Sequence, residues 1–141
     1  MLGSTIVVNI AVDYRGALLL VNASSNTVAD SFLTNRGGDG ICISYGGGNT
    51  ILRSTVTGGG GSFEGMSLNL TSATTLSGSY FLGEYAVYIN GSTSTVISDC
   101  VFISTTNNAG RAALSLSNGS VNLTLTSSTL RGTSVSIALR L

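Results

Sequence analysis

The sequence of 141 residues contains no lysine, histidine, proline or tryptophan, and only 9% of its residues are charged. Soluble domains carry about 25% charged residues on average, so the depletion is strong. The absence of histidine excludes a Ser-His-Asp triad, a Cys-His catalytic pair and a zinc site with histidine ligands. Six arginines balance six acidic residues, which leaves no basic excess for nucleic acid. We therefore expect no enzyme activity, cofactor, metal site or nucleic acid partner.

Long apolar runs are also missing, although the mean hydropathy is +0.42. Runs such as 18–21 and 86–89 are far shorter than the roughly 20 apolar residues of a spanning helix, so we expect no membrane span. Residues 1–4 lack the charged and apolar regions of a signal peptide. Cys42 and Cys100 are too few for a disulfide framework, and we expect both to pack unpaired as small apolar groups.

An internal repeat dominates what the sequence does contain. Its first motif is Thr, apolar, any, any, Ser or Asp, any, apolar, and successive copies begin 20 to 29 residues apart. This alignment predicts inward-facing columns that include Val96 and Val101. The copies are 27–33, 50–56, 75–81, 95–101 and 124–130, with a weaker one at 5–11.

A second motif alternates with the first and reads small, apolar, any, apolar. The alternation in both motifs is typical of strands with one buried face, and no segment shows a sustained helical period. Two short strands in each repeat, without helices, predict a β-solenoid whose rungs pair in parallel. An up-and-down barrel or sandwich is the alternative, which the unequal repeat spacing disfavours. The copies of the second motif are 17–20, 40–43, 65–68, 86–89, 113–116 and 136–139.

One polar position of the first motif predicts a ladder of turn side chains, each bonding to the backbone of the next rung. The motif resembles the short NosD-type repeats of the pectate-lyase-like superfamily, through runs such as 26–33 and 49–56. That resemblance covers nearly the whole chain and implies an all-β, right-handed parallel β-helix. We expect one domain, residues 1–141, with about six rungs and uncapped ends. The predicted ladder residues are Ser31, Ser54, Ser79, Asp99 and Ser128.

The two ends of the repeat pattern fit each other. In each repeat the Thr of the first motif follows the first apolar residue of the preceding second motif by 8 to 10 residues. If a second copy were placed directly after residue 141, its Thr5 would follow Ile137 by nine residues. This spacing predicts head-to-tail stacking into a filament. A fragment or tandem unit of a longer solenoid and a capped monomer are the alternatives. The predicted self-assembly residues are Thr5, Ile6, Val8, Ile10, Ile137, Leu139 and Leu141.

N-glycosylation sequons recur in the turn that follows one strand. Asparagine is also common in turns because it tolerates left-handed backbone, so the pattern has two readings. Glycans would line one edge of the rod and would explain how so uncharged a surface stays soluble. We therefore expect a location outside the cell or on its surface. The sequon residues are Asn22, Asn69, Asn90, Asn118 and Asn122.

Few residues in the sequence point to a catalytic or ligand-binding site. Asp39, Glu64 and Glu84 precede strands in neighbouring repeats and could form a solvated or arginine-paired acidic column. An outward threonine column is typical of ice-binding solenoids, yet only one repeat has Thr-x-Thr. The sequence therefore favours a structural subunit of an extracellular filament whose partners are copies of itself and covalent glycans. The alternatives are a carbohydrate-binding β-helix segment of an adhesin or phage tail spike, and a polysaccharide lyase or hydrolase fragment.

Overall fold

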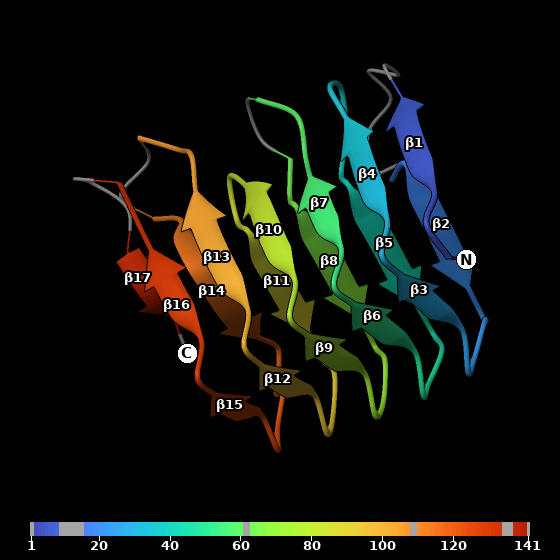
Figure 1. The fold of residues 1–141 in the computed structure, drawn as a ribbon. Coiled ribbons are helices and arrows are strands. Elements are labelled where there is room, and N and C mark those ends of the chain that lie inside the picture. Colours follow the sequence, from blue (N-terminus) through green and yellow to red (C-terminus); the bar gives the residue numbers. More distant parts are fainter. Residues whose placement is uncertain (1, 9–15, 61–62, 108–109, 134–136, 141) are drawn as a thin grey trace.

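The fold was analysed in a computed structural model, which describes residues 2–8, 16–60, 63–107, 110–133 and 137–140. These residues form 17 short strands that wind into a parallel β-solenoid (Figure 1). In this described part of the chain no helix is long and apolar enough to cross a membrane. The all-β fold expected from the repeat is therefore confirmed.

Each complete rung contains three strands rather than the two expected from the sequence. The first is β2 (Leu18–Val21), β3 (Thr27–Ala29) and β4 (Phe32–Asn35). Four more complete rungs follow, and β1 (Thr5–Val8) and β17 (Ile137–Arg140) add a partial rung at each end. The remaining strands are β5 (Ile41–Ser44), β6 (Thr50–Leu52), β7 (Thr55–Thr57), β8 (Met66–Asn69), β9 (Thr75–Ser77), β10 (Tyr80–Gly83), β11 (Val87–Asn90), β12 (Val96–Ser98), β13 (Val101–Ser104), β14 (Ala112–Ser117), β15 (Thr124–Thr126) and β16 (Thr129–Arg131).

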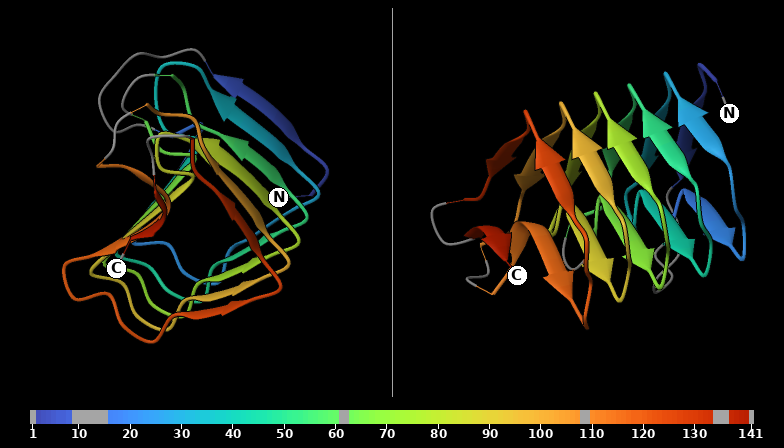
Figure 2. Two further views of the ribbon diagram at one scale, coloured as in Figure 1. Left: turned by 90° about the vertical axis from the view of Figure 1, so that its left-hand side faces the viewer. Right: turned by 90° about the horizontal axis from the view of Figure 1, so that it is seen from below.

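Three parallel sheets enclose the core, as the view along the stack shows (Figure 2). Sheet A has the order β3-β6-β9-β12-β15. Sheet B has the order β1-β4-β7-β10-β13-β16, and sheet C has the order β2-β5-β8-β11-β14-β17. Sheets B and C therefore each contain one strand more than sheet A.

The extra strand per rung arises at a corner inside the first motif. Asp30, Arg53 and Asp99 have positive φ angles of 51°, 43° and 54° at equivalent positions, and Gly78 occupies the same position with φ 56°. A left-handed residue turns the chain sharply, so sheets A and B meet at this corner. The inward residues on the two sides of the turn, such as Ile51 and Val56, are five residues apart, so the alternation shifts by one residue at the corner and two strands form where the sequence predicted one.

The core is a set of columns in which each buried side chain contacts its counterpart one rung away. Ile41, Met66, Val87 and Leu114 form one such column, and each is fully buried. Phe81 and Phe102 stack with ring centroids 5.3 Å apart. Cys42 and Cys100 are buried and free, as expected from the sequence.

The repeat alignment is wrong by one residue in the rung that contains β12. Val96, not Thr95, pairs with Thr75, and the buried side chain is Ile97. Val96 is 42% exposed, and Phe102 rather than Val101 faces the core. The reason is the length of the preceding turn, since Val96 follows Val87 by nine residues, the same spacing as in the three preceding rungs.

The register at both ends also differs from the expectation. Thr5 pairs with Phe32 rather than aligning with Thr27, so β1 belongs to sheet B. At the other end Ile137 pairs with Ala112, and Leu139 is the counterpart of Leu114. The spacing argument, in which Thr5 of a second copy follows Ile137 by nine residues, assumed other registers for these two strands and therefore does not hold.

Candidate functional site

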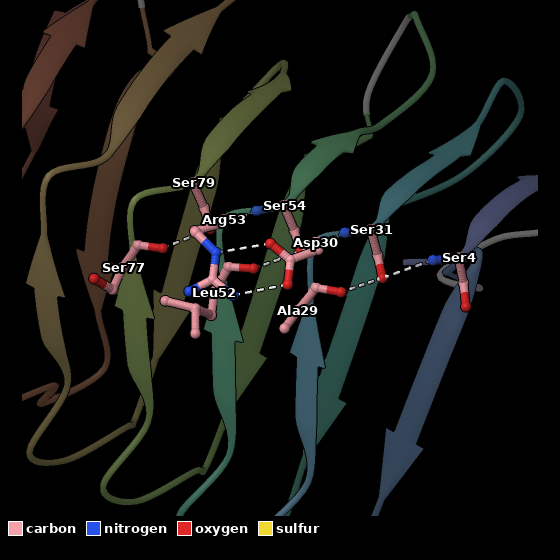
Figure 3. A network of polar contacts seen from close by, with 9 residues as sticks. All are labelled: Ser4, Ala29, Asp30, Ser31, Leu52, Arg53, Ser54, Ser77 and Ser79. Atoms are coloured by element: carbon pink, nitrogen blue, oxygen red, sulfur yellow. Dashed lines mark hydrogen bonds and ion pairs between the residues drawn. The ribbon is translucent and has the colours of Figure 1, made fainter. Parts of the chain in front are cut away.

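A ladder of hydroxyl groups follows the corner between sheets A and B (Figure 3). Ser54 Oγ accepts a hydrogen bond of 3.1 Å from the backbone N–H of Ser31 and donates one of 2.8 Å to the carbonyl of Leu52. Ser79 repeats both bonds with the N–H of Ser54 and the carbonyl of Ser77. Each hydroxyl thus joins two neighbouring rungs and satisfies backbone groups that the corner removes from the sheets.

The ladder agrees with the sequence prediction at Ser31, Ser54, Ser79 and Ser128, but not at Asp99. Cys100 occupies the fourth position of the ladder, where its N–H donates to Ser128 Oγ at 3.1 Å and its Sγ lies 3.2 Å from the carbonyl of Ser98. Burial raises the pKa of the Cys100 thiol, so it remains neutral. Asp99 instead takes the left-handed corner position.

The same corner carries one exposed ion pair between neighbouring rungs. Arg53 donates from Nε and Nη2 to the two carboxylate oxygens of Asp30, each at 2.7 Å. The hydrogen bonds from Arg53 hold the pKa of Asp30 below its usual range. Because both side chains are exposed, this pair fastens two turns without adding much stability.

The two ends of the solenoid are stepped in a complementary way. At one end sheet B extends one strand beyond the neighbouring sheet C, through β1. At the other end sheet C extends one strand further, through β17. Core side chains are only partly buried at both ends, including Ile6 and Leu18 at one and Leu125 and Leu130 at the other.

The predicted self-assembly residues lie at these ends. Thr5 is exposed and Ile6 packs against the core in β1. The backbones of Val8, Ile137 and Leu139 belong to β1 and β17. Ile10 and Leu141 lie outside the described residues, as do the side chains of Val8, Ile137 and Leu139.

A groove runs along the outer face of sheet C and was not predicted from the sequence. Its larger part is a cavity of about 650 Å³ whose lining includes Tyr85, Tyr88, Ser115 and Ser117. The two tyrosine rings lie 5.2 Å apart, and the hydroxyl groups of Tyr88 and Ser117 are hydrogen-bonded at 2.8 Å. Tyr85 is buried beneath Arg111, whose guanidinium lies 4.8 Å from the ring centroid, so Tyr88 is the ring open to the cavity. One aromatic ring beside hydroxyl and amide groups is suited to a neutral polar ligand.

A carboxyl pair lies in the smaller part of the groove, a cavity of about 110 Å³ that also contacts Tyr88. Asp39 is almost fully buried and accepts hydrogen bonds from the N–H of Glu64 at 3.0 Å and from Ser67 Oγ at 3.3 Å. Burial, together with the hydrogen bond and charge of Asp39, raises the pKa of Glu64 to about 8. Glu64 therefore carries a proton at neutral pH.

Glu84 does not join this column, contrary to the sequence expectation. Tyr85 is the residue aligned with Glu64, as the bond from the Gly65 N–H to the Tyr85 carbonyl shows. Glu84 instead accepts from Thr106 at 3.1 Å and pairs with Arg111 at 3.4 Å. In the described part of the chain no three acidic, cysteine or histidine side chains gather as a metal site.

The five sequon asparagines occupy three positions of one turn region. Asn22, Asn118 and Asn122 are exposed and have positive φ angles of 51°, 50° and 57°. Asn69 and Asn90 end their strands, are half-buried, and are joined by a 3.2 Å bond from Asn90 Nδ2 to Asn69 Oδ1. The turn geometry accounts for the first three asparagines without any modification.

A family model described as a right handed beta helix region matches residues 3–140. The chain belongs to the right-handed β-helix family. The fold-level resemblance drawn from the repeat is thereby confirmed for nearly the full length of this β-helix. No curated protein and no solved structure matches the chain significantly.

Proposed function

We propose that this β-helix is a structural subunit that stacks head to tail with copies of itself. The observation that carries the proposal is the pair of complementary steps at its ends. In a stack, β16 of one copy would lie beside β1 of the next, and β17 beside β2. Sheets B and C would then continue through the contact, and half-buried core residues such as Leu130 and Ile6 would cover each other.

Two end-blocking variants test the stacking. Leu130→Asp and Ile6→Asp each place a charge on one end, so each alone should remain near the 14.3 kDa monomer mass while the native chain grows with concentration. An equal mixture should form dimers and nothing longer, because each variant keeps one intact end. Thr50→Asp, on the outer face of sheet A, is the control and should assemble. A native chain that stays monomeric at every concentration in light scattering would refute the proposal.

Glycosylation and a location outside the cell belong to the same proposal. The exposed Asn22 and Asn122 are the favoured acceptors, because the side-chain amides of Asn90 and Asn118 donate hydrogen bonds to Asn69 and Asn90. Glycans at one corner would leave both stacking ends free. The intact mass of protein from its native source tests this, and a mass equal to the bare 14.3 kDa chain would contradict it.

A second candidate function is binding of a neutral saccharide chain in the sheet C groove. The half-buried Tyr88 in the 650 Å³ cavity favours it, since sugars stack on aromatic rings while their hydroxyl groups bond to polar side chains. Titration with neutral and acidic oligosaccharides should show binding of the neutral class that Tyr88→Ala abolishes. Tyr80→Ala, a half-buried tyrosine on sheet B, should bind normally. Equal loss in both variants would argue against the groove.

A further inference from the structure

The hydroxyl ladder between sheets A and B continues to the end of the solenoid that carries β1. Gly3 takes the left-handed corner conformation there, with φ 54°. Ser4 Oγ donates a hydrogen bond of 3.2 Å to the carbonyl of Leu2, as Ser31 Oγ does at 2.7 Å to that of Ala29. The backbone N–H of Ser4 donates to Ser31 Oγ at 3.3 Å, and Figure 3 shows Ser4 in line with the ladder. Ser4 therefore has the geometry of a ladder residue.

The two ends of this ladder lack opposite halves of the same hydrogen bond. Inside the chain each ladder oxygen accepts a backbone N–H from the preceding rung, as Ser54 Oγ does from Ser31. Among the described residues, no N–H donates to Ser4 Oγ. At the other end, the N–H of Ser128 finds no acceptor in that same part of the chain. One end thus offers an acceptor and the other a donor.

Two backbone hydrogen bonds accompany each interior step of the ladder. The left-handed residue of one rung donates to a carbonyl of the next rung, as Asp30 does to Leu52 at 3.0 Å. The residue after the ladder serine donates in the opposite direction, as Thr55 does to the carbonyl of Ser31 at 2.9 Å. Each corner therefore defines three bonds whose donors and acceptors alternate between rungs.

We propose that Ser4 sets the register of the head-to-tail contact, its Oγ accepting the backbone N–H of Ser128 from the preceding copy. The inference rests on the stacking proposed above and names the bonds that align it. Two backbone bonds would flank this one, from the Ser127 N–H to the Leu2 carbonyl and from the Thr5 N–H to the Ser128 carbonyl. The contact would then repeat the three bonds of an interior corner.

A second copy of the chain is the partner that these ends fit. Ser127 takes the left-handed conformation with φ 46°, and Gly3 supplies the matching corner of the rung that would follow it. A slip of one residue would turn Ile6 away from the core and leave the Ser128 N–H without a hydroxyl acceptor. The serine hydroxyl therefore favours one register among those that free strand edges allow.

Two end-blocked chains isolate a single contact for measurement. The Leu130→Asp chain keeps its β1 end and the Ile6→Asp chain keeps its β16 end, so an equal mixture forms one dimer whose dissociation constant analytical ultracentrifugation measures. Adding Ser4→Ala to the Leu130→Asp chain should weaken this dimer at least about fivefold, because the Ser128 N–H loses its acceptor. Adding Ser4→Cys instead should weaken it less, since a thiol occupies the equivalent position at Cys100.

Ser79→Ala in the same Leu130→Asp chain is the matched control. It removes an interior ladder hydroxyl, so it should lower the free energy of unfolding and leave the dissociation constant unchanged. Ser4→Ala should do the reverse, because the bond of its hydroxyl to Leu2 is exposed. Native-like association of Ser4→Ala, or equal weakening by Ser79→Ala, would overturn the ladder contact and leave the stacking intact. End-blocked chains that never associate would overturn both.

Discussion

At four of the five corners between sheets A and B, one hydroxyl oxygen both accepts a backbone N–H from the preceding rung and donates to a carbonyl of its own rung. Only a short side chain with donor and acceptor on one atom can make both bonds there. Cys100 keeps this geometry with a weaker acceptor. The ladder therefore predicts how substitutions at a single position rank.

We expect Ser54→Ala to lower the free energy of unfolding by about 1–3 kcal/mol, because it leaves the buried Ser31 N–H without its partner. Ser54→Cys should lose less, since a thiol occupies the same position at Cys100. In urea denaturation, the free energy of unfolding should decrease in the order native chain, Ser54→Cys, Ser54→Ala. An alanine variant as stable as the native chain would show that the ladder contributes nothing.

The carboxyl pair predicts a pH dependence of stability. The pKa of Glu64 is raised to about 8 in the folded chain, so the folded state binds its proton more tightly than the unfolded state does. Stability should be full below about pH 4 and should fall by a few kcal/mol as the pH rises through about 8. Glu64→Gln, measured by denaturation across this range, should flatten the profile. An unchanged profile in the variant would mean that Glu64 does not cause the pH dependence of stability.

At the scale of the strand, loop length outweighs residue type. In β12 the threonine that marks the corresponding position in the other rungs lies one residue too early, and the pairing follows the nine-residue spacing of the three preceding rungs instead. A slip of one residue would turn the whole strand over and expose Ile97. Burying the more apolar set of side chains therefore decides the register.

Because of this register, substitutions at two adjacent residues should affect the free energy of unfolding very differently. Ile97→Ala should cost about 2–5 kcal/mol because it opens a cavity in a fully buried column. Val96→Thr, at an outward position that threonine occupies in four other rungs, should change stability by less than about 0.5 kcal/mol. Chemical denaturation of both variants decides the matter. The reverse order would restore the register expected from the repeat.

At the scale of the molecule, each rung contacts only its two neighbours, so stability is distributed along one axis. The central columns, from Ile41 to Leu114, are fully buried, whereas Leu18 and Leu125 near the ends are not. Local opening should therefore begin at the ends and proceed inward.

Hydrogen exchange of the dilute chain should show this gradient, with slowest exchange in β8 and β11 and fastest in β1, β15 and β16. Raising the concentration should protect the end strands selectively if copies stack, because their free edges become paired. The sheet A strands of the middle rungs provide the internal control. Uniform protection along the chain would contradict a stepwise solenoid.

The sequence by itself determined the β-solenoid, the repeat length, most of the inward columns and four ladder serines, because alternation and turn chemistry are local and recur in every rung. It also determined that the cysteines stay apart. The tertiary structure alone decided the corner that makes three sheets, the shift at β12, the registers of β1 and β17 and the groove with its pair of carboxyl groups. These depend on how rungs lie against one another, since left-handed corners, strand pairing and the approach of Asp39 to Glu64 involve residues some 25 positions apart.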